Sequence, residues 1–132
     1  MYGLGGSYNA GFAFTPNYTT PAYSKSHWQV NGTTLVTLDG SGNLGLGVTP
    51  SAWYSTSGYT ALQVNSASIA TRGTNILVNS NAYTSTSGGG WKYINSDYAT
   101  YYAQSSGQHI WNTAPSGTAG NAITWTHAMT LD

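Results

Sequence analysis

Charged side chains are the scarcest feature of this 132-residue sequence. Only 5% of the residues are charged, the formal net charge is zero, and glutamate is absent. An ordinary globular domain carries about 25% charged residues. Tracking a nucleic acid backbone or an anionic membrane surface requires many clustered cations, so three scattered basic residues predict neither of these partners.

Cysteine and long apolar runs are also missing. The sequence has no cysteine, which excludes a disulfide framework and thiolate chemistry. No stretch approaches the roughly 20 apolar residues that a membrane-spanning helix needs, so we expect no membrane insertion. The chain must therefore be stabilised without covalent cross-links.

The residues that are abundant favour β structure. Glycine (17), tyrosine (11) and tryptophan (5) stand out against a background of Ser, Thr and Asn. Thr, Tyr and Trp suit a pleated, half-buried surface, whereas good helix formers are scarce. Large aliphatic side chains are few and widely spread, which predicts a protomer that buries apolar surface against other copies. A small monomeric sandwich with a Tyr-rich core is the alternative.

Two regions differ in their pattern. Residues 1–24 are rich in Gly, Asn, Tyr and Thr and contain Pro16 and Pro21, which predicts an extended N-terminal arm or connector. Residues 25–132 alternate short strand-like runs with turn clusters, which is typical of all-β proteins. Beyond the segment at 28–50, the expected strands are Ala61–Val64, Asn75–Asn79, Trp91–Asn95, Tyr98–Tyr102, Gln108–Asn112 and Ile123–Leu131.

The segment at 35–50 has the clearest pattern. A strand at 35–38 follows the Asn31-Gly32 turn and leads into a Gly-rich turn that begins at Asp39. Leu44, Leu46 and Val48 then recur with period two, so we expect them to share one face as packing residues. The glycines between them indicate that another backbone passes close by, as in a thin fibre.

The C-terminal strand repeats part of this pattern. By alternation, one face carries the following residues: Ile123, Trp125, His127, Met129 and Leu131. Of these, Ile123, Trp125 and Met129 are the predicted packing residues. The final Met-Thr-Leu-Asp of residues 129–132 repeats the Val-Thr-Leu-Asp of residues 36–39, so residues 128–132 read as the entry to a truncated next repeat.

The ordered run from Leu38 to Pro50, Leu-Asp-Gly-Ser-Gly-Asn-Leu-Gly-Leu-Gly-Val-Thr-Pro, resembles a segment that recurs in bacteriophage tail fibres and related virion appendages. The likeness covers about residues 35–64 and 123–132. It implies a fibrous, intertwined homotrimer of short β-strands, located in the virion, that contacts a receptor on the host. The family often carries a C-terminal chaperone domain, which is not recognisable in this sequence.

Catalytic chemistry has little support in the sequence. The three carboxylates are Asp39, Asp97 and Asp132, and the glycosidase pair of closely spaced carboxylates could form only across an interface between chains. Asp39 reads more simply as a turn former that binds its own backbone. The histidines are far apart and no nucleophile motif is present. We therefore predict no enzyme activity, no metal and no cofactor.

Aromatic residues are the class with binding potential. Tyr and Trp offer flat apolar faces with polar tips, which suit stacking on sugars and contacts between chains. The aromatic candidates for such contacts are Trp53, Tyr54, Tyr83, Trp91 and the cluster of Tyr98, Tyr101 and Tyr102. Of these, Trp53, Tyr54 and Trp91 are the candidates for contact with a host glycan. The sequence thus predicts a structural segment that spaces or presents a host-receptor-binding surface. A glycan-binding receptor module, a subunit of a secreted adhesive filament and a polysaccharide depolymerase are the alternatives.

Overall fold

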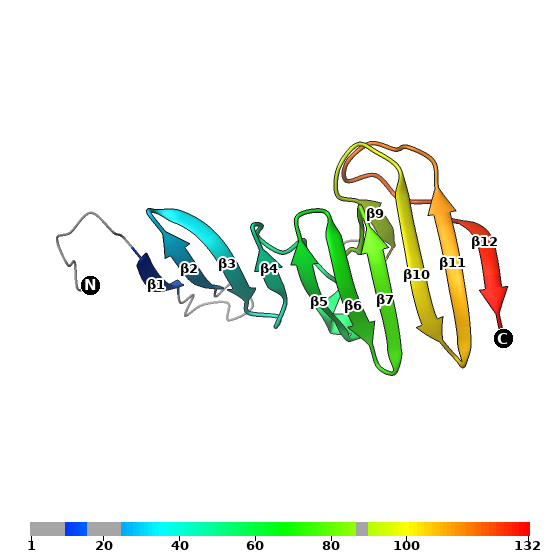
Figure 1. Cartoon of the computed structure of the whole chain (residues 1–132), viewed down its shortest axis with the longest axis horizontal. Coiled ribbons are helices and arrows are strands. Elements are labelled where there is room, and N and C mark those ends of the chain that lie inside the picture. The colour runs from blue at the N-terminus through cyan, green and yellow to red at the C-terminus, as the bar shows by residue number, and fades with distance from the viewer. Residues whose placement is uncertain (1–9, 16–24, 87–89) are drawn as a thin grey trace.

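A computed structural model describes residues 10–15, 25–86 and 90–132 (Figure 1). The expectation of an extended arm at 1–24 falls largely outside these residues. Its described part, Ala10–Thr15, forms strand β1 and pairs along its whole length with the strand at Lys25–Val30. The described residues contain no helix of the length and hydrophobicity that a membrane crossing requires.

The fold is all-β, as the composition predicted, and most of it is one mixed sheet of ten strands. The strands lie side by side along the long axis of the molecule in the order β1-β2-β3-β4-β5-β6-β7-β10-β11-β12 (Figure 1). Their bounds are β1 Ala10–Thr15, β2 Lys25–Val30, β3 Thr33–Asp39, β4 Leu44–Leu46, β5 Tyr59–Val64, β6 Ala67–Arg72, β7 Asn75–Ser80, β10 Ala99–Ser105, β11 Gln108–Ala114 and β12 Thr126–Leu131. A separate hairpin consists of β8 (Ala82–Thr84) and β9 (Trp91–Tyr93).

Tight turns join most neighbouring strands. Asn31 and Gly32 have φ values of 50° and 76°, and Ser106 and Gly107 have 55° and 81°. Two consecutive residues with positive φ match the turn whose twist suits an antiparallel hairpin, and Asn-Gly is its preferred sequence. The predicted Asn31-Gly32 turn therefore joins β2 to β3, and Ser106-Gly107 joins β10 to β11.

The turn from β3 to β4 is organised by Asp39. Its Oδ1 accepts hydrogen bonds from the backbone N–H groups of Ser41 and Asn43, both at 2.9 Å, and its Oδ2 accepts one from the Asn43 side chain. The Asn43 amide oxygen in turn accepts the N–H of Ala61 in β5 at 3.0 Å. Asp39 is thus a turn former, as the sequence predicted.

Gly45 in β4 meets the close backbone that its sequence context predicted. A Cβ atom at this position would lie 2.1 Å from the carbonyl oxygen of Val48 and 2.9 Å from Cδ of Pro50. The approaching backbone belongs to the same chain, because the segment after β4 folds back over this strand. β4 ends at Leu46, and Gly47 has a φ of 68°, so Val48 does not continue the alternation that we expected for it.

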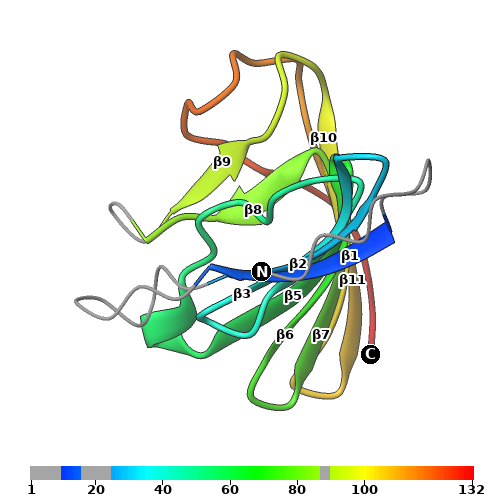
Figure 2. The same ribbon diagram turned by 90° about the vertical axis from the view of Figure 1, so that its left-hand side faces the viewer.

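One face of the sheet is covered. β4 and β5 pair in parallel, and the chain between them crosses this face, carrying Trp53 and a short 3-10 turn at Ser55–Ser57. The β8–β9 hairpin also packs on this side, as the view along the long axis shows (Figure 2). Two buried clusters result. One contains Trp53, Ala61 and Ala70, and the other contains Ala82, Tyr93, Ala99 and Ala114.

The covered face holds small and polar side chains. Among the described residues, six of the nine buried hydrophobic residues are alanine, so little aliphatic side chain is enclosed. The fully buried Gln63 accepts hydrogen bonds from Ser51 N and Trp53 Nε1 and donates one to Asn65 O. This pairing satisfies the buried amide and fixes the crossing segment on the sheet.

The prediction of one continuous face along the last strand is wrong, because a β-bulge interrupts the strand. Trp111 pairs with Met129, but the next residue, Asn112, pairs with His127, so Ala128 is the extra residue. The strand begins at Thr126, and the bulge breaks the strict alternation from 123 to 131. Ile123 and Trp125 precede the strand and pack against the covered-face cluster, whereas Met129 pairs with Trp111 on the opposite face.

Candidate functional site

The uncovered face of the sheet carries a continuous line of apolar side chains, which we call the apolar row. The register places one member on each of eight consecutive strands, from β3 to β12, directly opposite its neighbours. The members are Leu38, Leu44, Leu62, Ile69, Val78, Tyr102, Trp111 and Met129. The row follows the long axis of the molecule, since the strands are arranged along that axis (Figure 1).

Several members of the apolar row are exposed to a degree unusual for their type. Ile69 is 47% exposed and Val78 is 45% exposed, although both lie in central strands of the sheet. Aliphatic side chains in central strands are normally buried. Contiguous apolar surface of this kind marks an interaction site.

A second line of residues extends this surface at one end. It runs beside the apolar row and begins with large apolar side chains in β2, β3, β4 and β5, namely Trp28, Val36, Leu46 and Val64. Farther along the sheet it continues with small or hydroxyl side chains, Ala67, Ser80, Thr100 and Thr113. Neither line contains a charged residue, so burying this surface would not leave a charge without a partner.

Three aromatic rings form a ladder within this face. Tyr102 and Trp111 are cross-strand partners with ring centroids 5.0 Å apart, and the His109 ring stacks on Tyr102 at 5.9 Å. The Tyr102 hydroxyl forms a hydrogen bond with Nδ1 of His109. Beside the ladder runs a shallow groove lined by side chains that include Val78, Thr100, Tyr102 and Trp111. Such a platform can stack on an apolar partner or on a sugar ring.

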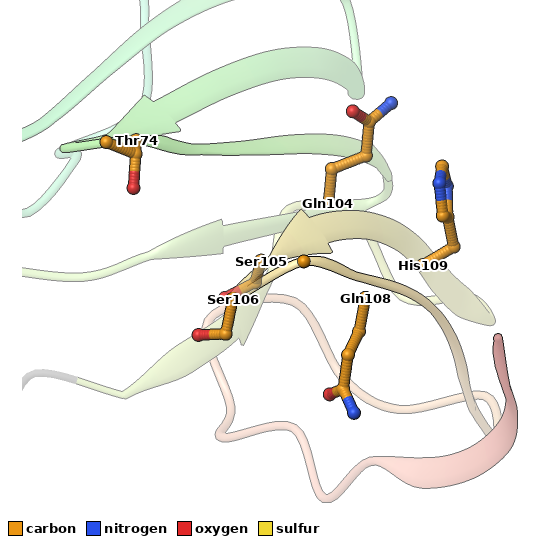
Figure 3. A pocket seen from close by; sticks show the side chains of 7 residues that line it. Thr74, Gln104, Ser105, Ser106, Gln108 and His109 are labelled. Carbon is orange, nitrogen blue, oxygen red and sulfur yellow. The ribbon is translucent and has the colours of Figure 1, made fainter. Parts of the chain in front are cut away.

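The tip of the β10–β11 hairpin forms a second, polar hollow (Figure 3). Gln104 and His109 project from one side of the hairpin and Gln108 from the other (Figure 3). The lining also includes Thr74, Ser105 and Ser106. These groups can donate and accept hydrogen bonds, but the lining contains no carboxylate and no cation.

The predicted glycan-contact residues are all at least partly buried. Trp53 is only 1% exposed and packs edge-on against Tyr83 with centroids 6.2 Å apart, so its ring offers no free face to a sugar. Trp91 is half-buried and stacks on Tyr101 at 5.2 Å with nearly parallel planes. Tyr54, beside Trp53, is half-buried. Trp53 and Trp91 therefore both pack against other aromatic rings on the covered side.

The predicted packing residues divide between the two faces. Leu44 and Leu46 both lie on the open face, the former in the apolar row. Met129 is also there and is 52% exposed. Ile123 and Trp125 instead pack on the covered side, where Trp125 meets the Tyr101 ring edge-on at 4.7 Å.

Burial raises the pKa of the Tyr101 phenol, and the nearby Tyr59 adds to the rise. In the described part of the chain, no group of three or more His, Asp or Glu side chains comes together to hold a metal ion. His27 and His127 each interact with a threonine hydroxyl, Thr37 and Thr130 respectively.

Sequence reasoning named Tyr102 as one of a tyrosine cluster with binding potential, but it did not identify Trp111 or Ile69 as parts of the same surface. Tyr102 and Trp111 lay in predicted strands, and a signal for their pairing was present. A two-residue turn at Ser106-Gly107 places residue 105 opposite 108, and hence 102 opposite 111. Ile69 was missed because its strand, Ala67–Arg72, was not predicted at all.

The open face is thus the candidate functional surface of this chain, and its register and exposure define it. Comparisons of the chain with protein-family models, with curated proteins and with solved structures gave no match. The functional argument therefore rests on the geometry and chemistry of the two faces of the sheet.

Proposed function

We propose that this chain is a structural segment of a virion fibre, of the kind that its 38–50 segment resembles in bacteriophage tail fibres. In this proposal three copies pack their open faces together around the fibre axis. The segment then spaces a host-receptor-binding surface from the virion, or presents it. The apolar row carries the proposal, because it gives each copy one extended hydrophobic surface along its long axis.

The extent of that surface supports association with other copies. Burying one Leu, Ile or Val side chain fully contributes about 1.5–3 kcal/mol. Eight row positions therefore offer ample energy for assembly, even though each is already partly shielded by its neighbours. A surface without charges also imposes no requirement for a charged partner, which suits packing between identical copies.

Packing the open faces inward would leave the covered side facing solvent. That side carries the β8–β9 hairpin and the crossing segment between β4 and β5 (Figure 2). Loops mounted on a rigid sheet are common places for receptor contact. In this arrangement the outer loops present the receptor-binding surface, and the sheet holds the copies together.

The experiment is a measurement of mass in solution with a matched pair of variants. Ile69→Lys places a charge in the apolar row, and Thr71→Lys places the same charge on the same strand face, outside the row. We expect sedimentation analysis to give a trimer for the parent chain and for Thr71→Lys, and a folded monomer for Ile69→Lys. A parent chain that is monomeric at about 100 μM, where even a weak association would show, contradicts the proposal.

A glycan-binding receptor module is the second candidate, favoured by the Tyr102–Trp111 platform and the groove beside it. Binding of a host glycan would then use the open face of a single chain. Trp111→Ala would abolish glycan-array binding, whereas Trp91→Ala, on the covered side, would preserve it if the fold is retained. Loss of trimer in the Ile69→Lys variant without any glycan signal favours the fibre instead.

A subunit of a secreted adhesive filament is the third candidate, because among the described residues both edge strands of the sheet, β1 and β12, have a neighbouring strand on one side only. Open strand edges can template the addition of further strands. Such a subunit would give assemblies whose length grows with concentration, whereas a closed trimer would keep one mass.

A further inference from the structure

The two ends of the sheet are built alike. β2 and β3 at one end correspond to β11 and β12 at the other, and the correspondence extends to the tryptophan in each pair. Trp28 pairs with Val36, and Trp111 pairs with Met129. The Val-Thr-Leu-Asp that ends β3 and the Met-Thr-Leu-Asp at 129–132 therefore occupy equivalent places in the sheet.

The equivalence includes an irregularity of the backbone. In the first pair the register shifts directly after Trp28, since Gln29 pairs with Thr34 and Leu35 is the extra residue. In the second pair the shift falls directly after Trp111, and the extra residue is Ala128. A shared bulge position is a specific feature, because bulges are placed features of a sheet rather than random defects. The sequence echo is therefore a structural repeat.

The preceding strands extend the repeat. β1 pairs with β2 so that Phe12 lies opposite Trp28, and β10 pairs with β11 so that Tyr102 lies opposite Trp111. Three strands at one end of the sheet thus match three at the other, although their connections differ in length. The spacing between the equivalent Val36 and Met129 is 93 residues, since 129 minus 36 is 93.

The strand beside β3 is present at the first end of the sheet and has no described equivalent at the second. At the first end, β4 pairs with the edge of β3. Leu38 lies opposite Leu44, Thr37 opposite Gly45 and Val36 opposite Leu46. At the second end, the equivalent positions Leu131, Thr130 and Met129 have no strand beside them among the described residues. An unpaired edge of this kind is a template for strand addition.

We propose that the free edge of β12 is a docking site for a strand of the Leu44-Gly45-Leu46 pattern, supplied by a second copy of residues 40–132 that has no β3 of its own to hold this strand. The docked strand runs antiparallel to β12 and places its glycine opposite Thr130. Its two leucines lie opposite Leu131 and Met129 and extend the open face.

Side-chain chemistry makes the site selective for this strand. Asp132 is equivalent to Asp39, whose carboxylate accepts the N–H groups of Ser41 and Asn43 in the turn that leads into β4. In this structure Asp132 accepts a hydrogen bond from Gln108, which leaves its second oxygen available for such a turn. Glycine is required in the strand because, at Gly45, a Cβ would collide with the backbone of Val48.

This inference deepens the proposed fibre, since strand docking joins units along the sheet while the open faces join copies around it. Face packing and strand docking can be disproved independently of each other. The mass of the Ile69→Lys variant tests face packing, and the state of the β12 edge tests docking.

The test is a tandem protein in which residues 40–132 are appended after Asp132. We expect amide hydrogen exchange at Thr130 and Asp132, the counterparts of Thr37 and Asp39, to be about a hundredfold slower in the tandem than in the single chain. The same tandem with Gly45→Val in the appended copy is the matched control, and there we expect exchange as fast as in the single chain.

Two results would overturn the inference. Equal exchange in the single chain and the tandem would mean that the appended strand leaves the edge open. Equal protection in the tandem and its Gly45→Val control would mean that another segment covers β12. Circular dichroism of both tandems shows whether the appended copy is folded. As an independent test, a synthetic peptide of residues 39–50 is added to the full single chain, and exchange is measured at the same two amides.

Discussion

The two faces of the ten-stranded sheet reverse the usual distribution of side chains. The covered face encloses alanines together with Thr37, Gln63 and Asn79, while the open face exposes Ile69 and Val78. A monomeric β-sandwich would place the large aliphatic residues in its core. The reversal leaves the largest exposed aliphatic side chains of the sheet on the open face, as the proposed packing between copies requires, while hydrogen bonds on the covered face hold the crossing segment.

Each face is therefore stabilised by different means. On the covered side, hydrogen bonds from buried amides hold the crossing segment, with Gln63 accepting the Trp53 indole N–H at 3.2 Å. A buried amide left without its partner costs about 1–3 kcal/mol, so this arrangement tolerates little change. On the open side, the members of the apolar row are only partly buried, and a partner would be needed to bury them further.

The largest expected effect comes from removing the main side chain of the covered face. Trp53→Ala should lower the free energy of unfolding by about 3–5 kcal/mol, because it leaves a cavity and removes one of the two hydrogen bonds that Gln63 Oε1 accepts. Chemical denaturation monitored by circular dichroism measures the change. Trp53→Phe is the control and should lose less, because it keeps most of the volume. A Trp53→Ala variant as stable as the parent would mean that the crossing segment does not hold the fold together.

Adjacent residues in β7 compare the faces directly. Leu77 is 8% exposed on the covered side, and Val78 is 45% exposed in the apolar row. In a monomeric background, Leu77→Ala should cost about 2–5 kcal/mol of unfolding free energy and Val78→Ala less than about 0.5 kcal/mol.

The same two substitutions also compare the faces by their effects on self-association. Val78→Ala should weaken self-association of the parent chain, since it removes a row side chain. Sedimentation at a series of concentrations reports this loss. Equal effects of the two substitutions on monomer stability would show that the faces are not distinct in the way described.

The smallest expected effect is a change in how the free energy of unfolding varies with pH. Burial raises the pKa of Tyr101, so the folded state favours the neutral phenol. The stabilisation is fully present below the ordinary tyrosine pKa of about 10 and is lost as the pH rises through the raised value of the folded state. Unfolding titrations between pH 8 and 12 should therefore show a smaller decline for Tyr101→Phe, which keeps the ring stacked on Trp91. An identical decline in both proteins contradicts this role for Tyr101.

Local turn chemistry made much of the fold predictable. Asn31-Gly32 predicted its hairpin, and Asp39 predicted its own turn, because both depend on residues within a few positions. Strands β6 and β8 were missed. Ala67–Arg72 has only one large apolar residue, and Ala82–Thr84 is three residues long, so their pairing depends on neighbours distant in sequence.

The candidate surface was harder to predict than the strands. Alternation divides a strand into two faces, but it does not say which face another element covers. The natural assumption places large apolar side chains inward, whereas here Trp53 and the β8–β9 hairpin cover the face of small residues. The bulge at Ala128 likewise follows from the pairing of β12 with β11, which sequence alternation does not contain.

The charge-free character of the open face has a consequence for the medium in which assembly occurs. Coulombic contacts weaken as ionic strength rises, but burial of apolar surface does not depend on screening. Association through the apolar row should thus not weaken as the ionic strength rises. Its driving force fades on cooling, as hydrophobic burial does, so cold rather than salt sets the conditions under which such an assembly would loosen.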